Sequence, residues 1–312
     1  MLNSIFSTLF TMRFLLTIIR MATPIIFAAL GAFVAASTGI GNIAIESIMT
    51  FSALAGVLGS YLTGNAWMGV LLGLIVGVLT VMLIAFFSMK LGADAFLIMI
   101  ALNTFADAVA IFVLYQITGD KGTTASLSTP ILDTIEIPII KDIPIIGEIL
   151  SGQFVLTYIC WILVAVLFVM IYKTPLGMRM RACGLNAEAA RTAGINVEKL
   201  RVLSLVLSGM LAGLGGMYLS LNYLKIFSKG MVSGQGWMGV AANGIANGNY
   251  WVLVLSAVIF AVFRAVSIIF SSNSAFPTDL VGAIPYFSVF VILTSVSIIN
   301  YYRVKRCKVE GE

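Results

Sequence analysis

The 312-residue chain contains no histidine, and its three cysteines lie at positions 160, 183 and 307. Only 10% of its residues are charged. The cysteines lack the spacing of zinc, haem or iron–sulfur ligands. A nucleophile and its base cannot be assembled without histidine and with so few interior carboxylates. We therefore expect no metal site, no cofactor and no enzymatic activity in this chain.

Apolar residues make up 60% of the chain, and the mean hydropathy is +1.07. Such a composition cannot be covered by a water-facing surface and indicates an integral membrane protein. The uncharged runs 70–87 and 251–263 supply, with their neighbours, the roughly 20 residues of a helical span, and they lack the alternation of spanning strands. We predict an all-α membrane helical bundle that forms one domain over residues 1–312.

Hydropathy predicts about ten transmembrane helices, some of them short or broken. Nine spans are expected at 22–38, 41–62, 66–87, 93–115, 154–172, 202–222, 231–248, 251–271 and 278–301. Residues 3–20 are a tenth candidate, which we interpret as retained and not as a signal peptide because Arg13 and Arg20 interrupt its apolar run.

The distribution of lysine and arginine predicts the orientation, because cytoplasmic loops retain these residues. Six of the eighteen lie in 173–201 and four in the tail 303–312, whereas 116–152 carries five acidic and two basic residues. We assign the first two segments to the cytosol and the third to the external face. Ten spans place both termini in the cytosol. Nine spans would place the N-terminus outside. That alternative stays open because Arg20 lies at the outer end of the candidate span 3–20.

The net charge of +5 is explained by these loops and by a tail that anchors at the anionic lipids of the inner leaflet, so nucleic acid is not an expected partner. Small residues recur four positions apart, as in Gly69/Gly73/Gly77, and predict tightly packed helices. The stretch 230–249, GMVSGQGWMGVAANGIANGN, is too polar and glycine-rich for a lipid-facing helix. We interpret it as a short or broken helix inside the protein.

The cytosolic segment 173–201 contains a short capped helix. Pro175 and Gly177 are expected to end the preceding span, Asn186 to cap a helix through Ala193, and Gly194 to end it in the left-handed conformation. Asn196 then caps the next span. A helix of this kind suits the transmission of force from a soluble partner; an ordinary positively charged loop is the alternative.

The sequence TPLGMRMRACGLNAEAARTAGINVEKLRVLSLVLSGMLAGLGGMYLSL resembles the coupling-helix region of bacterial ABC importer permeases of the ribose-type branched-chain and simple-sugar superfamily. The stretches GIGNIAIESIM, IPIIKDIPIIGEIL and GMVSGQGWMGVAANGIANGNYWVLVLSAVIFAVFRA agree in order and spacing. The likeness is strongest to permeases for nucleosides or simple sugars. One departure is that Ala44 and Ser47 stand where the family commonly has glycine.

The resemblance implies a permease subunit that imports nucleosides or simple sugars by alternating access, with ATP hydrolysed by a separate cytosolic subunit. It also implies a second, related permease subunit, which forms a heterodimer with this chain in preference to a homodimer. An external substrate-binding lipoprotein would dock on the 116–152 loop. The implied location is the bacterial inner membrane. The implied ATPase-coupling element comprises Asn186, Ala187, Glu188, Ala189, Ala190, Arg191, Thr192, Ala193 and Gly194.

Polar residues within the predicted spans are few and can be weighed singly. Asp107 and Arg264 share a depth in their spans, and we predict that they form a buried ion pair. Polarity and position suggest six candidates for the translocation path: Asn42, Glu46, Asn103, Gln235, Trp237 and Asn243.

Two other classes of function stay open at this point. A secondary transporter or channel would work without ATP, but an ion-coupled carrier needs titratable groups along its path, and only Glu46 and Asp107 lie well inside predicted spans. A membrane scaffold would need neither the capped helix nor the glycine-rich segment.

Overall fold

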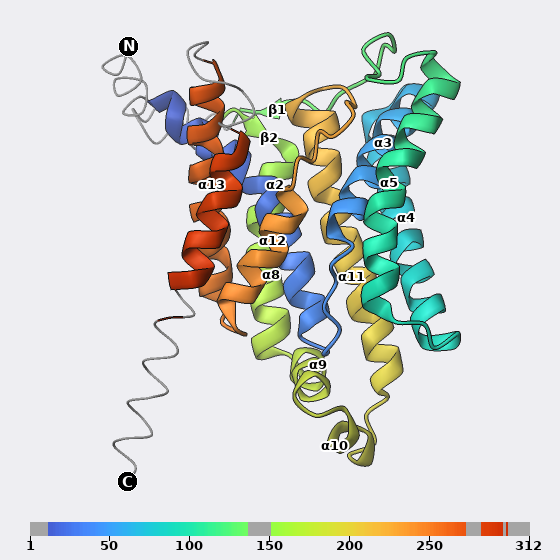
Figure 1. Ribbon diagram of the computed structural model, residues 1–312, viewed down its shortest axis with the longest axis vertical. Helices are drawn as coiled ribbons and strands as arrows, with labels where there is room; N and C mark the ends of the chain where they lie inside the picture. Colours follow the sequence, from blue (N-terminus) through green and yellow to red (C-terminus); the bar gives the residue numbers. More distant parts are fainter. Residues whose placement is uncertain (1–11, 137–150, 273–281, 296–297, 299–312) are drawn as a thin grey trace.

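The computed structural model describes residues 12–136, 151–272, 282–295 and 298, which form an almost entirely helical bundle (Figure 1). Seven helices within these ranges are long and apolar enough to cross a membrane. Their helical bounds are α2 (Met12–Ala36), α3 (Ile45–Thr63), α4 (Ala66–Ala85), α5 (Ala95–Thr118), α8 (Val155–Lys173), α11 (Val197–Met217) and α13 (Tyr250–Ser272). The predicted all-α membrane bundle is confirmed.

Shorter elements complete the described part of the chain. Two π-helical turns extend α4 and α11, namely η1 (Phe86–Lys90) and η2 (Tyr218–Tyr223). The remaining helices are α9 (Pro175–Leu185), α10 (Ala187–Thr192), α12 (Gln235–Ala246) and the apolar helix Gly282–Ser295. The two strands β1 (Thr134–Ile135) and β2 (Gln153–Phe154) pair antiparallel, with Thr134 opposite Phe154.

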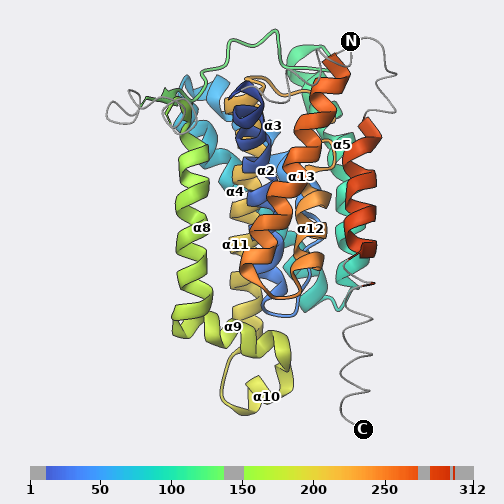
Figure 2. The same cartoon turned by 90° about the vertical axis from the view of Figure 1, so that its left-hand side faces the viewer.

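The two charged connections lie at opposite ends of the bundle. Helices α9 and α10 protrude from one end, and β1 and β2 cover the other (Figures 1 and 2). This arrangement agrees with the opposite sides predicted for 173–201 and 116–152. Residues 137–150, which include most of IPIIKDIPIIGEIL, and the tail 303–312 lie outside the described residues.

The first described helix corrects the predicted N-terminal span. Residues 12–20 do not belong to a separate element, because α2 runs without a break from Met12 to Ala36, through Pro24. This helix begins at the end of the bundle that carries β1 and β2 and descends toward α9 (Figure 1). Residues 1–11 lie outside the described residues, so the predicted cytosolic position of both termini stays a prediction.

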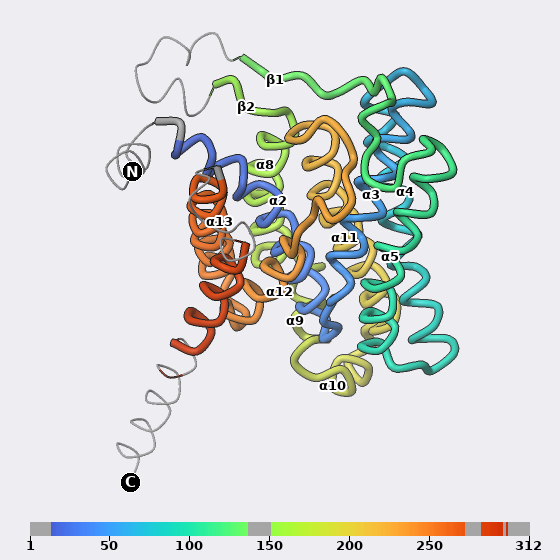
Figure 3. Tube along the Cα trace, turned by 45° about the horizontal axis from the view of Figure 1, so that its top comes forward, coloured from blue at the N-terminus to red at the C-terminus, as the bar shows by residue number. Residues whose placement is uncertain are grey.

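Two helices begin in the interior of the bundle and not at its ends. Residues 40–44 enter α3 without helical structure, and α12 follows the irregular segment 224–234. The 12 residues of α12 rise about 18 Å at about 1.5 Å each, which is less than the roughly 30 Å of a hydrocarbon core. Helix α12 packs against α2, α3 and α13 (Figure 3). The predicted short helix within 230–249 is confirmed.

Close helix crossings occur at glycines, as the recurrence of small residues in the sequence predicts. A Cβ added at Gly77 would lie 2.8 Å from the carbonyl oxygen of Gly209, and one added at Gly209 would lie equally close to that of Gly77. At Gly216 an added Cβ would overlap the backbone of Met49. Helix α11 can therefore approach α4 and α3 at backbone distance, as expected where van der Waals contact holds helices together. Gly244 is different, because a Cβ there meets no atom within 4 Å.

Candidate functional site

Helix α10 is built by local capping. The Asn186 side-chain oxygen accepts hydrogen bonds from the backbone N–H groups of Glu188 and Ala189, each at 3.0 Å. Gly194 follows the helix with φ of +79°, a conformation that glycine adopts without steric cost. The side chain of Asn196 accepts from the Lys199 N–H at 3.0 Å and starts α11. The predicted caps and turn are therefore formed.

Helix α9, which precedes α10, was not predicted from the sequence. Lys173 ends α8 as expected, but Pro175 occupies the first turn of a new helix, where its missing N–H costs nothing. Thr174 caps this helix by accepting from the Gly177 N–H at 3.3 Å. A Cβ at Gly177 would overlap the carbonyl oxygens of Met170 and Ile171. Proline and glycine therefore shape a sharp turn between two helices and do not end helical structure.

Helix α10 is fixed on its inner side and open on its outer side. Ala190 is buried against Cys183 of α9 and Val197 of α11, in a small apolar cluster separate from the main core. The other coupling candidates from 187 to 194 are exposed, apart from the half-buried Ala187. Arg191 and Glu198 approach to 3.9 Å across the turn. The exposed residues are available to a partner while α10 keeps a defined position on α9 and α11.

Leu185, the last residue of α9, is another feature that sequence reasoning missed. Its side chain is 89% exposed, although it lies in a polar segment directly before the Asn186 cap. An apolar residue in that position commonly packs onto the following helix as a hydrophobic staple. Here it does not, so an apolar side chain next to α10 faces outward.

The interior break between α2 and α3 is held by two asparagines. Asn42 is buried, donates to the Ser208 hydroxyl at 2.9 Å and accepts from the Ala44 N–H at 3.0 Å. Asn103 of α5 accepts from the Ser47 N–H at 3.0 Å and donates to the Ile43 carbonyl at 3.1 Å. Both amides replace backbone partners that a continuous helix would have supplied, which is required where water is absent.

The interior start of α12 is capped by a residue from α3. Two oxygens of the Glu46 carboxylate accept hydrogen bonds from the backbone N–H groups of Gly234 and Gly236, each at 2.8 Å. Helix α12 has no side-chain cap of its own, since Gly234 stands at its N-cap with φ of +77°. Glu46 also lies in the first turn of α3. Its carboxyl group is thus placed at the positive ends of two helices.

The predicted ion pair between Asp107 and Arg264 is not formed. Asp107 is exposed on α5, whereas Arg264 is half-buried on α13. Each of them interacts electrostatically with Glu46. The prediction failed because the depth of a residue in the membrane does not determine the rotation of its helix, and therefore does not determine which neighbour its side chain faces. Glu46 therefore replaces Asp107 as the carboxylate near Arg264.

The other predicted path residues fall into different surroundings. Trp237, in the first turn of α12, is 42% exposed, while Gln235 is only 2% exposed. Asn243 lies farther along α12 and lines a cavity of about 320 Å³ with Ser37 and Arg181. Tyr286, which the sequence analysis did not select, donates to the Ser233 carbonyl at 3.1 Å and interacts electrostatically with Glu46. Glu46, Trp237 and Tyr286 thus surround the start of α12.

Comparison with known proteins agrees with this geometry. The chain is 30% identical to the nucleoside ABC transporter permease protein NupC of Lactococcus lactis, over 87% of this chain and 88% of that protein. It is also 30% identical to the guanosine ABC transporter permease protein NupQ of Bacillus subtilis, over 88% of each. The fold is similar to that of a chain in the solved structure of PsaBC from Streptococcus pneumoniae in complex with Fab. The TM-score is 0.55 at 14% identity, covering 94% of this chain and 95% of the other.

A family model described as branched-chain amino acid transport system / permease component matches residues 14–294. In this family ATP hydrolysis takes place in a separate subunit, and a binding protein delivers the substrate. The match includes both interior helix starts and the α9–α10 connection. This chain belongs to the family of permease components of branched-chain amino acid type transport systems.

Proposed function

We propose that this chain is the membrane subunit of an ABC importer for nucleosides, with simple sugars as the second candidate substrate class. The observation that carries the proposal is the similarity to two nucleoside-type permeases over almost the full length of the chain. The family model, which matches residues 14–294, includes the interior starts of α3 and α12 and the α9–α10 connection. The importer would work in the bacterial inner membrane.

Residues 186–194 act as the coupling element for a cytosolic ATPase. Their outer side is exposed, and Leu185 adds an exposed apolar side chain beside them. Ala190 and Val197 tie α10 to α11, and α11 packs against α2, α3 and α4 in the middle of the bundle. A displacement of α10 is therefore transmitted to the core through a rigid helix and not through a loose loop. ATP binding would use this connection to exchange outward-open and inward-open states.

The translocation path passes the start of α12. Trp237 and Tyr286 supply exposed aromatic faces on which a base can stack. The two Glu46 oxygens already accept from the Gly234 and Gly236 N–H groups, so Glu46 fixes the helix start that carries Trp237. Asn42, Asn103 and Gln235 serve the protein's own packing and backbone, because they are buried or have both amide groups in use. Asn243 lines the separate cavity nearer α9.

A second permease subunit covers the exposed side of α5. Asp107 is exposed in the middle of this apolar helix, and an ionised carboxylate facing lipid is costly. A partner subunit, with a water-filled path between the two, removes that cost. We infer a heterodimer, together with an external substrate-binding lipoprotein at the β1–β2 end of the bundle.

Uptake of labelled guanosine, uridine, ribose and glucose by a strain that lacks this gene tests the substrate class. We expect nucleoside uptake to be lost and to return with the wild-type gene. If only sugar uptake is lost, the substrate class is simple sugars and not nucleosides. Normal uptake of all four compounds would reject the proposal.

The same strain separates an ABC importer from a secondary transporter. A version of the partner ATPase that binds but does not hydrolyse ATP should abolish uptake through this permease. Uptake that continues, and that collapses instead with the ion gradient, would contradict ATP-driven import.

A further inference from the structure

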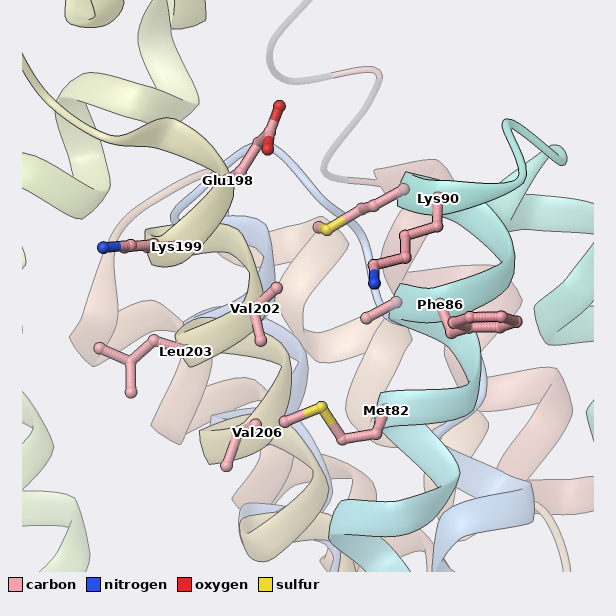
Figure 4. Close-up of a pocket in the computed structure, with 10 residues that line it drawn as sticks. Met82, Phe86, Lys90, Glu198, Lys199, Val202, Leu203 and Val206 are labelled. Atoms are coloured by element: carbon pink, nitrogen blue, oxygen red, sulfur yellow. The ribbon is translucent and has the colours of Figure 1, made fainter.

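A second cavity lies away from the proposed translocation path, between the end of α4 with η1 and the beginning of α11 (Figure 4). Its volume is about 830 Å³, which falls within the range of about 300–1,000 Å³ common for small-molecule sites. Met82 of α4 extends across the cleft toward Val206 of α11 (Figure 4). Ala85, Met89 and Val202 add apolar lining. The deep part of the cleft offers contacts to hydrocarbon and few polar partners.

Three charged side chains stand at the mouth of this cleft, and one of them, Lys90, faces it. Figure 4 shows the Lys90 side chain directed into the gap between the two helices. Lys199 and Glu198 stand at the edge contributed by α11. In Figure 4 the Glu198 and Lys199 side chains point away from the gap between the two helices. The ammonium group that faces the cleft is that of Lys90.

Both walls are helices that are apolar and long enough to cross a membrane. The cleft lies at their ends on the same side as α9 and α10 (Figure 1). In the predicted orientation this is the level of the inner-leaflet headgroups. The π-helical turn Phe86–Lys90 forms part of the wall, and such turns in α-helices frequently occur at functional sites.

We propose that this cleft binds an anionic phospholipid of the inner leaflet. One acyl chain packs against Met82, Ala85 and Val202, and the phosphate pairs with the Lys90 ammonium. Basic pockets between membrane helices on the cytoplasmic side recognise anionic headgroups in this way. The site is independent of the cargo, because its lining comes from α4, η1 and α11 and includes neither Glu46 nor α12.

Other occupants fit the cleft less well. A nucleoside or sugar would leave its hydroxyl groups without partners against the apolar lining. The chain's own tail carries Arg303, Lys305, Arg306 and Lys308, which have the same sign of charge as Lys90. A zwitterionic lipid would lack the net negative charge that Lys90 complements.

Native mass spectrometry of the purified, complete transporter tests the proposal. The complex is exposed to phosphatidylglycerol or to phosphatidylcholine in detergent, and the retained lipid is counted. We expect the wild type to retain phosphatidylglycerol in preference to phosphatidylcholine. Lys90→Gln should reduce that retention about fivefold, which corresponds to about 1 kcal/mol per basic residue near an anionic surface. Excess inorganic phosphate should not displace the lipid.

Lys173→Gln is the matched control, because Lys173 is an exposed lysine at the end of α8 and does not line the cleft. It should retain phosphatidylglycerol like the wild type. Val202→Trp fills the cleft without changing charge and should also reduce retention, while the complex stays monodisperse. Equal retention by all variants, or equal retention of both lipids by the wild type, would overturn the proposal. So would cross-linking that finds a protein segment in the cleft.

Discussion

Helices α10 and α12 both begin with a capped N-terminus, but the caps come from different places. Asn186 caps α10 from the adjacent position, through N–H groups two and three residues ahead. Glu46 caps α12 from 188 and 190 residues away in the sequence. The local cap lies on the exposed end of the bundle, whereas the remote cap lies among packed helices. The comparison shows that the same backbone requirement is met by local residues at an exposed helix start and by tertiary contacts at a helix start among packed helices.

The surroundings of each cap also determine how much it contributes to stability. Water can replace a lost hydrogen bond at α10, so its cap contributes about the 0.5–2 kcal/mol typical of exposed caps. The Gly234 and Gly236 N–H groups lie among packed helices, and leaving a buried N–H group unpaired costs about 1–3 kcal/mol. The interior cap should therefore control folding and assembly, and the exposed cap should control coupling.

The largest effect is expected for Gly236→Ala, which disturbs the remote cap. The added Cβ would lie 2.7 Å from both the backbone nitrogen and a carboxylate oxygen of Glu46, so α12 or α3 must shift. Overpacking of this kind costs about 1–3 kcal/mol. We expect loss of nucleoside uptake and a lower thermal stability of the purified complex.

Gly244→Ala is the matched control for this substitution, because it makes the same change in the same helix. A Cβ at Gly244 meets no atom within 4 Å, and alanine is favoured over glycine in a helix by about 0.5–1 kcal/mol. Uptake should be normal and stability unchanged or higher. If both variants lose uptake and thermal stability to the same extent, the effect of Gly236→Ala comes from alanine in α12 in general and not from the contact with Glu46.

A smaller effect on stability, but a specific effect on coupling, is expected for Asn186→Ala. Loss of the local cap should cost about 1 kcal/mol and loosen α10 without unfolding the bundle. We expect ATP hydrolysis by the complex to respond less to the binding protein, and uptake to fall in the same proportion. Both are measured in proteoliposomes.

Asn65→Ala removes a cap of the same chemistry at the start of α4, where Asn65 accepts from the Trp67 N–H at 2.9 Å. It lies at the end of the bundle opposite α10 and should leave coupling intact. If Asn65→Ala reduces the response of ATP hydrolysis to the binding protein as strongly as Asn186→Ala does, the proposal that residues 186–194 are the coupling element is wrong.

The smallest effect is expected for Glu198→Gln, which removes the ion pair beside α10. The side chains of Arg191 and Glu198 are 56% and 76% exposed and approach only to 3.9 Å. Exposed pairs contribute about 0–1 kcal/mol. Stability and uptake should stay within experimental error of the wild type at moderate salt. A marked loss of uptake that high salt does not reproduce would assign Glu198 a direct role in partner contact.

Local signals explain why the exposed region was predictable. The caps at Asn186 and Asn196 and the left-handed Gly194 depend on residues within a few positions, and all three occur in the structure. Helix α9 was missed because proline and glycine were taken as the end of a helix, although Thr174 and Pro175 also form a normal helix start.

Interior contacts were less predictable. Depth along two spans suggested Asp107 with Arg264, but depth leaves open the rotation of each helix and the identity of its neighbours. Asn42, Glu46 and Asn103 were selected from polarity and position as candidates for the translocation path, and that role stays a prediction. Their contacts to backbone groups in other segments could not be derived from spacing.

The amino-acid sequence by itself determined that this protein is a membrane bundle, where most of its helices lie, and how α10 is capped. These properties follow from hydropathy and from hydrogen bonds between near neighbours, which do not depend on how the chain folds back on itself. Only the tertiary structure decided that Glu46 caps α12, that Leu185 faces outward and that Lys90 faces an apolar cleft. Those contacts join segments far apart in the chain, and helix packing selects them after the helices have formed.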